Sequence, residues 1–289
     1  MNMELLIPTI KLDNQESIPP AKAINPKIIS VRIQDLLKKH SIQLNSLYYK
    51  IKEVGGIHKY LNYNGKVILS SIMRDDFLRR INNSIIFDIL ENIKPDYFIT
   101  SDCETYNNEF DYSKQQIKKS LINTMEILRL FPEIKPIGLI KGCERNQILA
   151  HYNLFKKLGI NIFVLHAGDF FRQGDESQIQ RLKAYANLVK KEDNILLLAG
   201  FGSQKRLEEF SFVDGYITYS HMVNAQHGIV LNGRKKEKNT CMTYHQAGVH
   251  NLKQMLLNLL DSKKQTKLTE FNLKWVAESE LPELIIQKQ

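Results

Sequence analysis

Polar residues that could take part in catalysis or binding follow short apolar segments at several points along the chain. A carboxylate, an imidazole or a hydroxyl can accept or transfer a proton, and an ammonium group can hold an anion. A single residue of this kind is often only a helix cap, so their value depends on whether the fold gathers them. The candidates are Ser70 and Ser71, Asp102, Lys141, His166 and Asp169, Gly200 and Gly202, and Ser220 with His221.

The segments that precede these residues are predicted to be strands. Each is short, apolar and rich in β-branched residues, which is typical of parallel strands buried on both faces. The eight segments are 5–10, 27–32, 66–71, 96–102, 136–141, 161–166, 194–200 and 215–220.

Apolar residues at helical spacing occupy most of the stretches between these strands. The stripes are Phe77, Ile81, Ile85 and Ile89; Leu121, Met125 and Leu128; Ile148, Tyr152 and Phe155; and Ile179, Leu182, Tyr185 and Val189. We interpret them as the core-facing sides of ordinary helices. Eight strands with helical crossovers predict a (β/α)₈ TIM-type barrel, in which the strand ends form one active face. An open doubly wound sheet is disfavoured, because residues 5–15 contain no glycine for a phosphate-binding loop.

The C-terminal part of the chain has a different pattern. Residues 228–235 predict a hairpin with a turn at Asn232 and Gly233, and 250–260 predict one more amphipathic helix. We therefore expect a single barrel domain over residues 1–261 and a charged tail over 262–289.

Composition restricts the cellular setting and the partners. The 289 residues include 40 Lys and Arg against 31 Asp and Glu, a net charge of +9 that favours a nucleic-acid partner. No segment predicts a membrane span or a secretion signal, and three scattered cysteines do not suggest a disulfide framework. We expect a cytoplasmic protein without membrane contacts.

Seven sequence blocks occur in an order that carries a family resemblance. They are VGGIHKYLNYNGKVILSS, PDYFITSDCETY, PIGLIKG, LGINIFVLHAGD, LAGFGS, VNAQHGIVLNG and the HNL at 250–252. Between about residues 54 and 260 the chain resembles the tRNA-guanine transglycosylase superfamily. The resemblance implies a barrel that exchanges guanine in a nucleic acid for a 7-deazaguanine base, through attack of a carboxylate on the sugar C1′.

The resemblance also implies a set of base-binding positions. Asp102 matches the family's base-reading aspartate, which accepts from the N1–H and the exocyclic amine of a guanine-type base. Lys141 stands where the family has glutamine, so it can donate to the base but cannot accept. The full set is Asp102, Lys141, Gly142, Ala167, Gly168 and Gly200.

The family's catalytic positions are altered in this chain. An ungapped match places Ser71 on the first aspartate and Ile217 on the nucleophile. A short shift in register would supply a carboxylate from Asp214, our first choice of nucleophile, or from Asp75 or Asp76, which lie just past Ser71. The alternative is a catalytically silent relative that binds nucleic acid or an active partner subunit, so enzyme activity stays open.

The family's zinc subdomain is reduced or absent. Cys241, His245 and His250 could form a structural zinc site, whereas ordinary surface histidines are the alternative. No other cofactor is expected. The compact C-terminal part favours DNA slightly over tRNA as the target.

A third hypothesis is an unrelated barrel acting on a phosphorylated metabolite through residues 200–204. The incoming base and a homo- or hetero-oligomeric state are left open.

Overall fold

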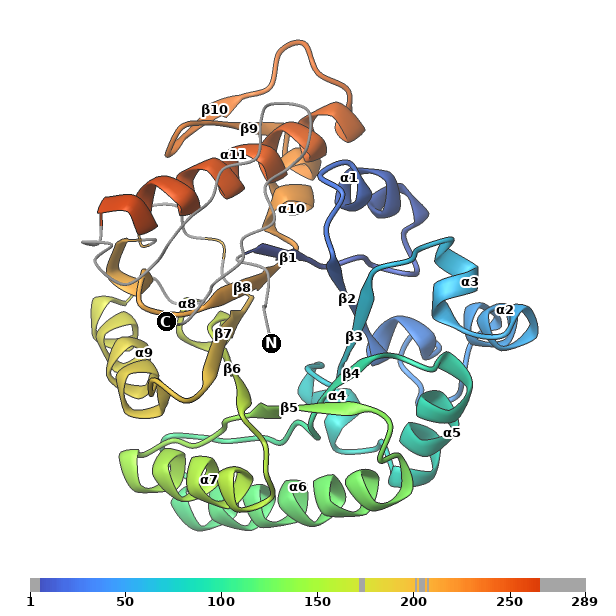
Figure 1. Cartoon of the computed structure of the whole chain (residues 1–289), viewed down its shortest axis with the longest axis vertical. Helices are drawn as coiled ribbons and strands as arrows, with labels where there is room; N and C mark the ends of the chain where they lie inside the picture. Colours follow the sequence, from blue (N-terminus) through green and yellow to red (C-terminus); the bar gives the residue numbers. More distant parts are fainter. Residues whose placement is uncertain (1–5, 172–174, 201, 203–205, 207, 266–289) are drawn as a thin grey trace.

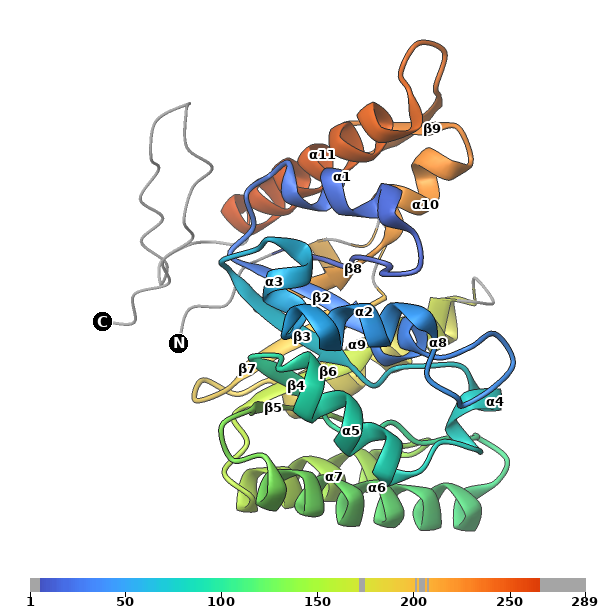
Figure 2. The same cartoon turned by 90° about the vertical axis from the view of Figure 1, so that its right-hand side faces the viewer.

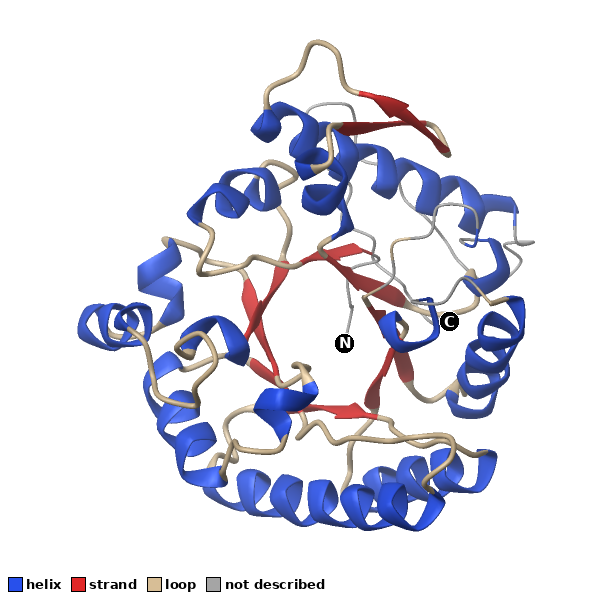
Figure 3. Cartoon of the chain, turned by 180° about the vertical axis from the view of Figure 1, so that it is seen from behind, coloured by secondary structure: helices blue, strands red, loops and turns tan. Residues whose placement is uncertain are grey.

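The computed structural model describes residues 6–171, 175–200, 202, 206 and 208–265. Eight parallel strands form a ring that is surrounded by helices, as Figure 1 and Figure 3 show. The predicted (β/α)₈ barrel is confirmed, and each strand lies in its predicted segment except the fifth, which begins one residue earlier, at Lys135. The strands are β1 (Leu6–Pro8), β2 (Ile28–Arg32), β3 (Lys66–Ser70), β4 (Tyr97–Ile99), β5 (Lys135–Leu139), β6 (Ile162–His166), β7 (Ile195–Ala199) and β8 (Gly215–Thr218).

The order of the strands around the ring is β1-β8-β7-β6-β5-β4-β3-β2. The ring is completed between the two terminal strands of this order, where Thr9 and Ser30 form a parallel bridge. The amide of Ile10 donates to the Ser30 carbonyl at 2.8 Å. Closure pairs the backbone groups that an open sheet would expose at its edges.

The helices lie outside the ring (Figure 1). They are α1 (Ile18–Lys22), α2 (Ser46–Val54), α3 (Ile57–Leu61), α4 (Asp75–Leu78), α5 (Asn83–Ile93), α6 (Phe110–Leu130), α7 (Arg145–Lys157), α8 (Gly168–Phe171), α9 (Glu176–Val189), α10 (Ser220–Gln226) and α11 (Tyr244–Gln265). Between β7 and β8 the described residues contain only a 3-10 turn at Glu208–Phe210.

Inward-pointing aliphatic residues fill the barrel, and two further apolar clusters join the strands to the helices. Alternation along each strand produces both layers, because successive side chains point to opposite faces. On β6, for example, Ile162 and Val164 face the barrel interior, while Phe163 and Leu165 pack under the helices. The next inward residue on this strand is His166, at the carboxyl end where the mouth of the barrel begins.

Two of the predicted helical stripes need correction. Asn82 accepts a hydrogen bond from the amide of Ile85 at 3.1 Å and caps α5, so the stripe that begins at Phe77 is divided between α4 and α5. Met125 is 54% exposed, and the buried side of α6 instead carries Ile117 and Ile127. The buried face was not recognised from the sequence because it also carries small polar residues, namely Ser113, Ser120 and Thr124.

The predicted hairpin is present as β9 (Ile229–Asn232) and β10 (Lys235–Lys238). Its two-residue loop is one position later than predicted, because Asn232 pairs with Lys235 and leaves Gly233 and Arg234 in the turn. Gly233 has a φ of 56°, a conformation that disfavours side chains with a Cβ.

The last helix, α11, packs against α10, β9 and α1. It runs to Gln265, so the predicted boundary at residue 261 falls inside a helix, and the rest of the predicted tail lies outside the described residues. None of the described helices has the length and apolarity to cross a bilayer.

Candidate binding site

A buried ion pair joins the ends of two neighbouring strands at the mouth of the barrel. Asp102 follows β4, Lys141 follows β5, and Lys141 Nζ lies 3.2 Å from Asp102 Oδ1. The two side chains are only 3% and 11% exposed. The amide of Cys103 donates to Asp102 Oδ1 at 2.8 Å, and the amide of Met73 lies 3.3 Å from Oδ2. The carboxylate thus holds together the loops that follow β3, β4 and β5.

A neutral histidine contacts the backbone of Lys141. His151 on α7 is fully buried, and its Nδ1 lies 3.2 Å from both the amide nitrogen and the carbonyl oxygen of Lys141. Burial lowers the pKa of His151 to about 4. The imidazole therefore adds no positive charge near pH 7.

His166 at the end of β6 is closely approached by two glycines. A Cβ at Gly168 would lie 2.9 Å from His166 Nε2, and a Cβ at Gly200 would lie 3.2 Å from the same atom. Gly200 also has a φ of +76°. Glycine at these two predicted base-binding positions therefore leaves room for the imidazole of His166.

The other two predicted base-binding positions, Ala167 and Gly142, have packing roles. Ala167 is fully buried, and its amide donates to the Ala199 carbonyl at 2.7 Å. Gly142 lines the cavity described below. A Cβ at Gly142 would lie 2.9 Å from the Gln147 Cβ, so glycine is needed where α7 approaches the end of β5.

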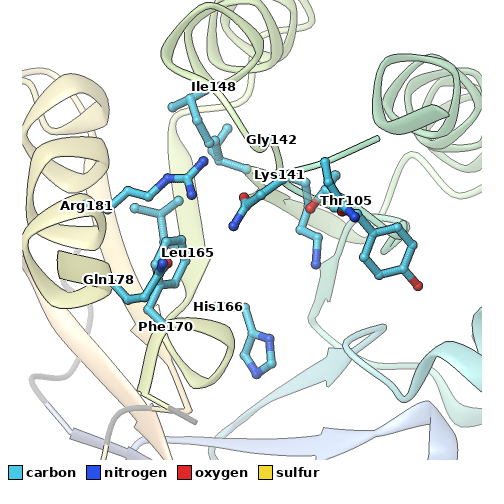
Figure 4. Close-up of a pocket in the computed structure, with 13 residues that line it drawn as sticks. Thr105, Lys141, Gly142, Ile148, Leu165, His166, Phe170, Gln178 and Arg181 are labelled. Atoms are coloured by element: carbon cyan, nitrogen blue, oxygen red, sulfur yellow. The ribbon is translucent and has the colours of Figure 1, made fainter. Parts of the chain in front are cut away.

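A cavity of about 310 Å³ opens beside Lys141 (Figure 4). Ile148, Leu165 and Phe170 form apolar walls, and Gln178 on α9 adds an amide. Basic side chains reach it from three elements, namely Lys141, His166 and Arg181. Asp and Glu are absent from the described residues that line it.

A second polar cluster lies at the rim of this cavity. Glu104 accepts hydrogen bonds from Arg79 Nε at 2.7 Å, the Tyr106 hydroxyl at 2.8 Å and the Tyr112 hydroxyl at 2.5 Å. Burial raises the pKa of Glu104, but these three bonds outweigh burial and hold the pKa below its ordinary value. Tyr106 lines the cavity, and its hydroxyl also lies 3.1 Å from Asp75 Oδ2. The structure therefore places Asp75 at the mouth.

The two positions that match the family's catalytic aspartates cannot supply a carboxylate. Ser71 is 1% exposed, and its hydroxyl donates to the Thr100 carbonyl at 2.5 Å. Ile217 is 4% exposed and belongs to the aliphatic interior of the barrel. Ser71 has a structural hydrogen bond, and Ile217 fills core volume.

Asp214 is not brought to the mouth. It immediately precedes β8, so it lies at the amino-terminal end of the barrel, the end opposite Asp102. Its Oδ2 accepts from the Leu196 amide at 2.7 Å and lies 2.7 Å from Lys190 Nζ. The predicted nucleophile is therefore a misassignment, because its carboxylate is used to join β7 and β8.

The predicted zinc ligands do not converge. His250 Nε2 lies 2.7 Å from the Leu231 carbonyl oxygen, Cys241 is exposed, and the ring of His245 packs beside Tyr244 at 5.7 Å. Within the part of the chain that the structure describes, His, Cys, Asp and Glu form no group of three that could hold a metal ion. The hydrogen bond of His250 to the hairpin gives this residue a packing role instead.

Several residues of the site were missed at the sequence level. Glu104 and Tyr106 directly follow Asp102 in the block DCETY and could have been noted there. Arg181, Gln178 and His151 lie on helices and have no local signal. The side chain of Asp169 and most of the segment 200–204 lie outside the described residues.

A scan against protein-family models and a search of curated proteins returned no match to this chain. The class that the structure defines is therefore the (β/α)₈ barrel with a polar mouth. The family resemblance remains a hypothesis.

Proposed function

We propose that this protein binds a guanine-type base of a nucleic acid at the barrel mouth without exchanging the base itself. The observation that carries the proposal is the placement of Asp102 and Lys141 side by side, 3.2 Å apart. A guanine-type base presents two donors, the N1–H and the exocyclic amine, next to a carbonyl acceptor. A carboxylate beside an ammonium group offers the complementary acceptors and donor.

Access to this pair is from the cavity. Asp102 is almost completely buried, and its partner Lys141 lines the cavity. A base that enters the cavity would take over part of the interaction with each partner. Such a base must be unstacked from its neighbours, as in other proteins that read an extruded base.

The chemistry of the altered positions disfavours exchange. Attack on C1′ needs an ionised carboxylate within bonding reach. Ser71 and Ile217 cannot supply one, and Asp214 is engaged at the opposite end of the barrel. These facts favour the silent relative over the exchanging enzyme.

Charge supports a nucleic-acid partner. The net charge is +9, and every residue of β10, including Lys235, Lys236 and Lys238, is exposed. Figure 2 shows β9 on the same side of the barrel as α4 and α8, which follow the carboxyl ends of β3 and β6. Lysines on the hairpin could therefore contact phosphates of a strand whose base enters the mouth.

We favour DNA as the target and the cytoplasm as the location. The stretch between β10 and α11 spans only residues 239–243, which leaves little chain for the zinc subdomain that the resemblance associates with tRNA enzymes. The three cysteines are unpaired, as a reducing compartment would maintain them.

The test measures base preference directly. Single-stranded oligonucleotides with one central guanine, hypoxanthine or adenine are titrated into the protein, and affinity is followed by fluorescence anisotropy. We expect guanine to bind about tenfold or more tightly than adenine, because mismatched donors and acceptors cost about 1–3 kcal/mol. Asp102→Asn should remove this preference. Asp193→Asn is the matched control, because Asp193 is an exposed carboxylate paired with Lys156. Equal affinity for all three bases in the wild type would reject the proposal.

A second candidate function, base exchange, is favoured by the position of Asp75. Its carboxylate is at the mouth, 3.1 Å from the hydroxyl of a cavity residue, Tyr106. In this reaction Asp75 would bond to C1′ while guanine leaves with the bonding electrons and gains a proton; the incoming base, losing a proton, would then displace the carboxylate. Incorporation of labelled guanine into DNA that is abolished by Asp75→Asn would support exchange, whereas activity unchanged in this variant would reject Asp75 as the nucleophile.

A further inference from the structure

One cation of the cavity, Arg181, has no carboxylate partner among the described residues. Arg79 and Arg206, by contrast, pair with Glu104 and Glu176. Arg181 instead contacts neutral groups. Its Nε donates to the Tyr185 hydroxyl at 2.8 Å, and one terminal nitrogen donates to the Cys143 carbonyl.

These contacts fix the guanidinium without neutralising it. The guanidinium carbon lies 5.4 Å from the centre of the Tyr185 ring, and the Tyr185 hydroxyl itself donates to the Cys143 carbonyl at 3.0 Å. A guanidinium has five N–H donors, and the two bonds above leave three. A fixed, charged fork with donors to spare is the arrangement that binds carboxylate and phosphate oxygens.

The surroundings of the fork suit an anion. Figure 4 shows the guanidinium of Arg181 directed into the cavity, with Gln178 on the same helix and Lys141 across from it. The described lining includes amide and hydroxyl groups from Gln178, Asn107 and Thr105. The apolar walls at Ile148 and Phe170 limit the water that competes for the anion.

We propose that this cavity is an oxyanion site, in which Arg181 binds a phosphate or carboxylate group of a ligand. The site adjoins the proposed base site but does not depend on it. The anion can come from a phosphate of a bound nucleic-acid strand or from a free small-molecule acid. Both sources share the same recognition by the guanidinium fork.

The first experiment uses inorganic phosphate as the probe. Binding to the folded state alone raises the thermal unfolding midpoint in proportion to the logarithm of ligand concentration. We expect phosphate to raise the midpoint of the wild type at constant ionic strength, and Arg181→Gln to weaken phosphate binding by about tenfold or more. Arg181→Lys keeps the charge but loses the fork, so its affinity should be intermediate.

Arg129→Gln is the matched control, since Arg129 is exposed in the last turn of α6, away from the cavity. It should bind phosphate like the wild type. Equal loss in both variants would mean a diffuse charge effect and would overturn the proposal.

A measurement on the wild type covers the case in which Arg181→Gln fails to fold. Crystals of the full chain soaked in tungstate should show an anomalous peak within hydrogen-bond distance of the Arg181 guanidinium. A peak only elsewhere, or no peak, would overturn the proposal.

The two sources of the anion are separated with an oligonucleotide. If the cavity holds a strand phosphate, Arg181→Gln also weakens oligonucleotide binding, and free phosphate competes with the oligonucleotide. If the cavity holds a free acid, the variant loses phosphate binding while its oligonucleotide affinity is unchanged. A wild-type protein that binds phosphate but shows no preference for guanine would reject the base site and leave the oxyanion site standing. The two proposals can therefore be tested independently.

Discussion

The two ends of the barrel use the same pair of residue types for different purposes. At the amino-terminal end, Asp96 pairs with Lys66 and Asp214 pairs with Lys190, each at 2.7 Å. Each carboxylate also accepts a hydrogen bond from a backbone amide on the preceding strand. Asp96 accepts from Val67 at 2.8 Å, and Asp214 accepts from Leu196 at 2.7 Å. These carboxylates therefore bind neighbouring strands to each other.

At the mouth, the pair of Asp102 and Lys141 is more deeply buried and adjoins a cavity. The Asp102 side chain is 3% exposed, against 19% for Asp96 and 17% for Asp214. Its partner Lys141 lines the cavity. An aspartate next to a barrel strand therefore indicates a ligand site only when it lies at the carboxyl end of the strand, because the loops at that end bind ligands.

The largest expected effect is on stability at the amino-terminal end. Asp214→Ala should lower the free energy of unfolding by about 2–3 kcal/mol, because it leaves the Leu196 amide and the Lys190 ammonium without their partner. Urea denaturation measures the loss. Oligonucleotide affinity of the folded variant should equal that of the wild type, and a large drop in affinity without loss of stability would return Asp214 to the functional site.

A glycine at the mouth provides the next test. Gly200→Ala should cost about 1–2 kcal/mol, because it puts a Cβ on a residue with a φ of +76°, 3.2 Å from His166 Nε2. The displaced imidazole should also weaken oligonucleotide binding. Gly228→Ala is the control: its φ is +65°, but a Cβ there meets no atom within 4 Å. Similar binding by both variants would show that His166 plays no part in the ligand site.

The acid limb of the stability curve tests the role of Asp96. Burial raises the pKa of Asp96, but hydrogen bonds from Lys66 and the Val67 amide, with the charge of His58, outweigh burial and lower the pKa. The unfolded chain binds this proton first, near pH 3.9. The stability from Asp96 is therefore complete above about pH 4 and is lost as pH falls through the lowered folded value.

In urea titrations between pH 5 and pH 3, Asp96→Asn should be less stable than the wild type at pH 5 and should lose less stability on acidification. Equal slopes for the two proteins would show that Asp96 contributes nothing to the acid limb.

The smallest effect is expected for the exposed hairpin. Replacing Lys235, Lys236 and Lys238 with glutamine should leave the stability unchanged, because all three side chains are exposed. The log–log slope of affinity against salt should become shallower by about 0.7 for each phosphate contact that is lost. An unchanged slope would show that these three lysines do not contact the phosphates.

The strands and their end residues could be predicted from the sequence because the signal is local. Segments such as 161–166 and 194–200 are short and apolar, and each became a barrel strand with its next polar residue at or near the mouth. Asp102 and Lys141 were singled out in this way. The stripe through Met125 failed because serine and threonine pack on the buried side of α6, where an apolar count does not register them.

The sequence by itself therefore determined the number and direction of the strands, and with them which end of each strand faces the mouth. It could not determine which charged groups meet. Asp214 lies only three residues before Ile217, yet β8 begins between them. The carboxylate therefore lies at the far end of the barrel, beside Lys190, which follows α9. Arg181 likewise became a cavity residue only because α9 packs beside α7, which brings Arg181 to Cys143 in the loop after β5. Such contacts join residues about 20 to 40 positions apart, and the closure of the barrel, rather than any local pattern, decides them.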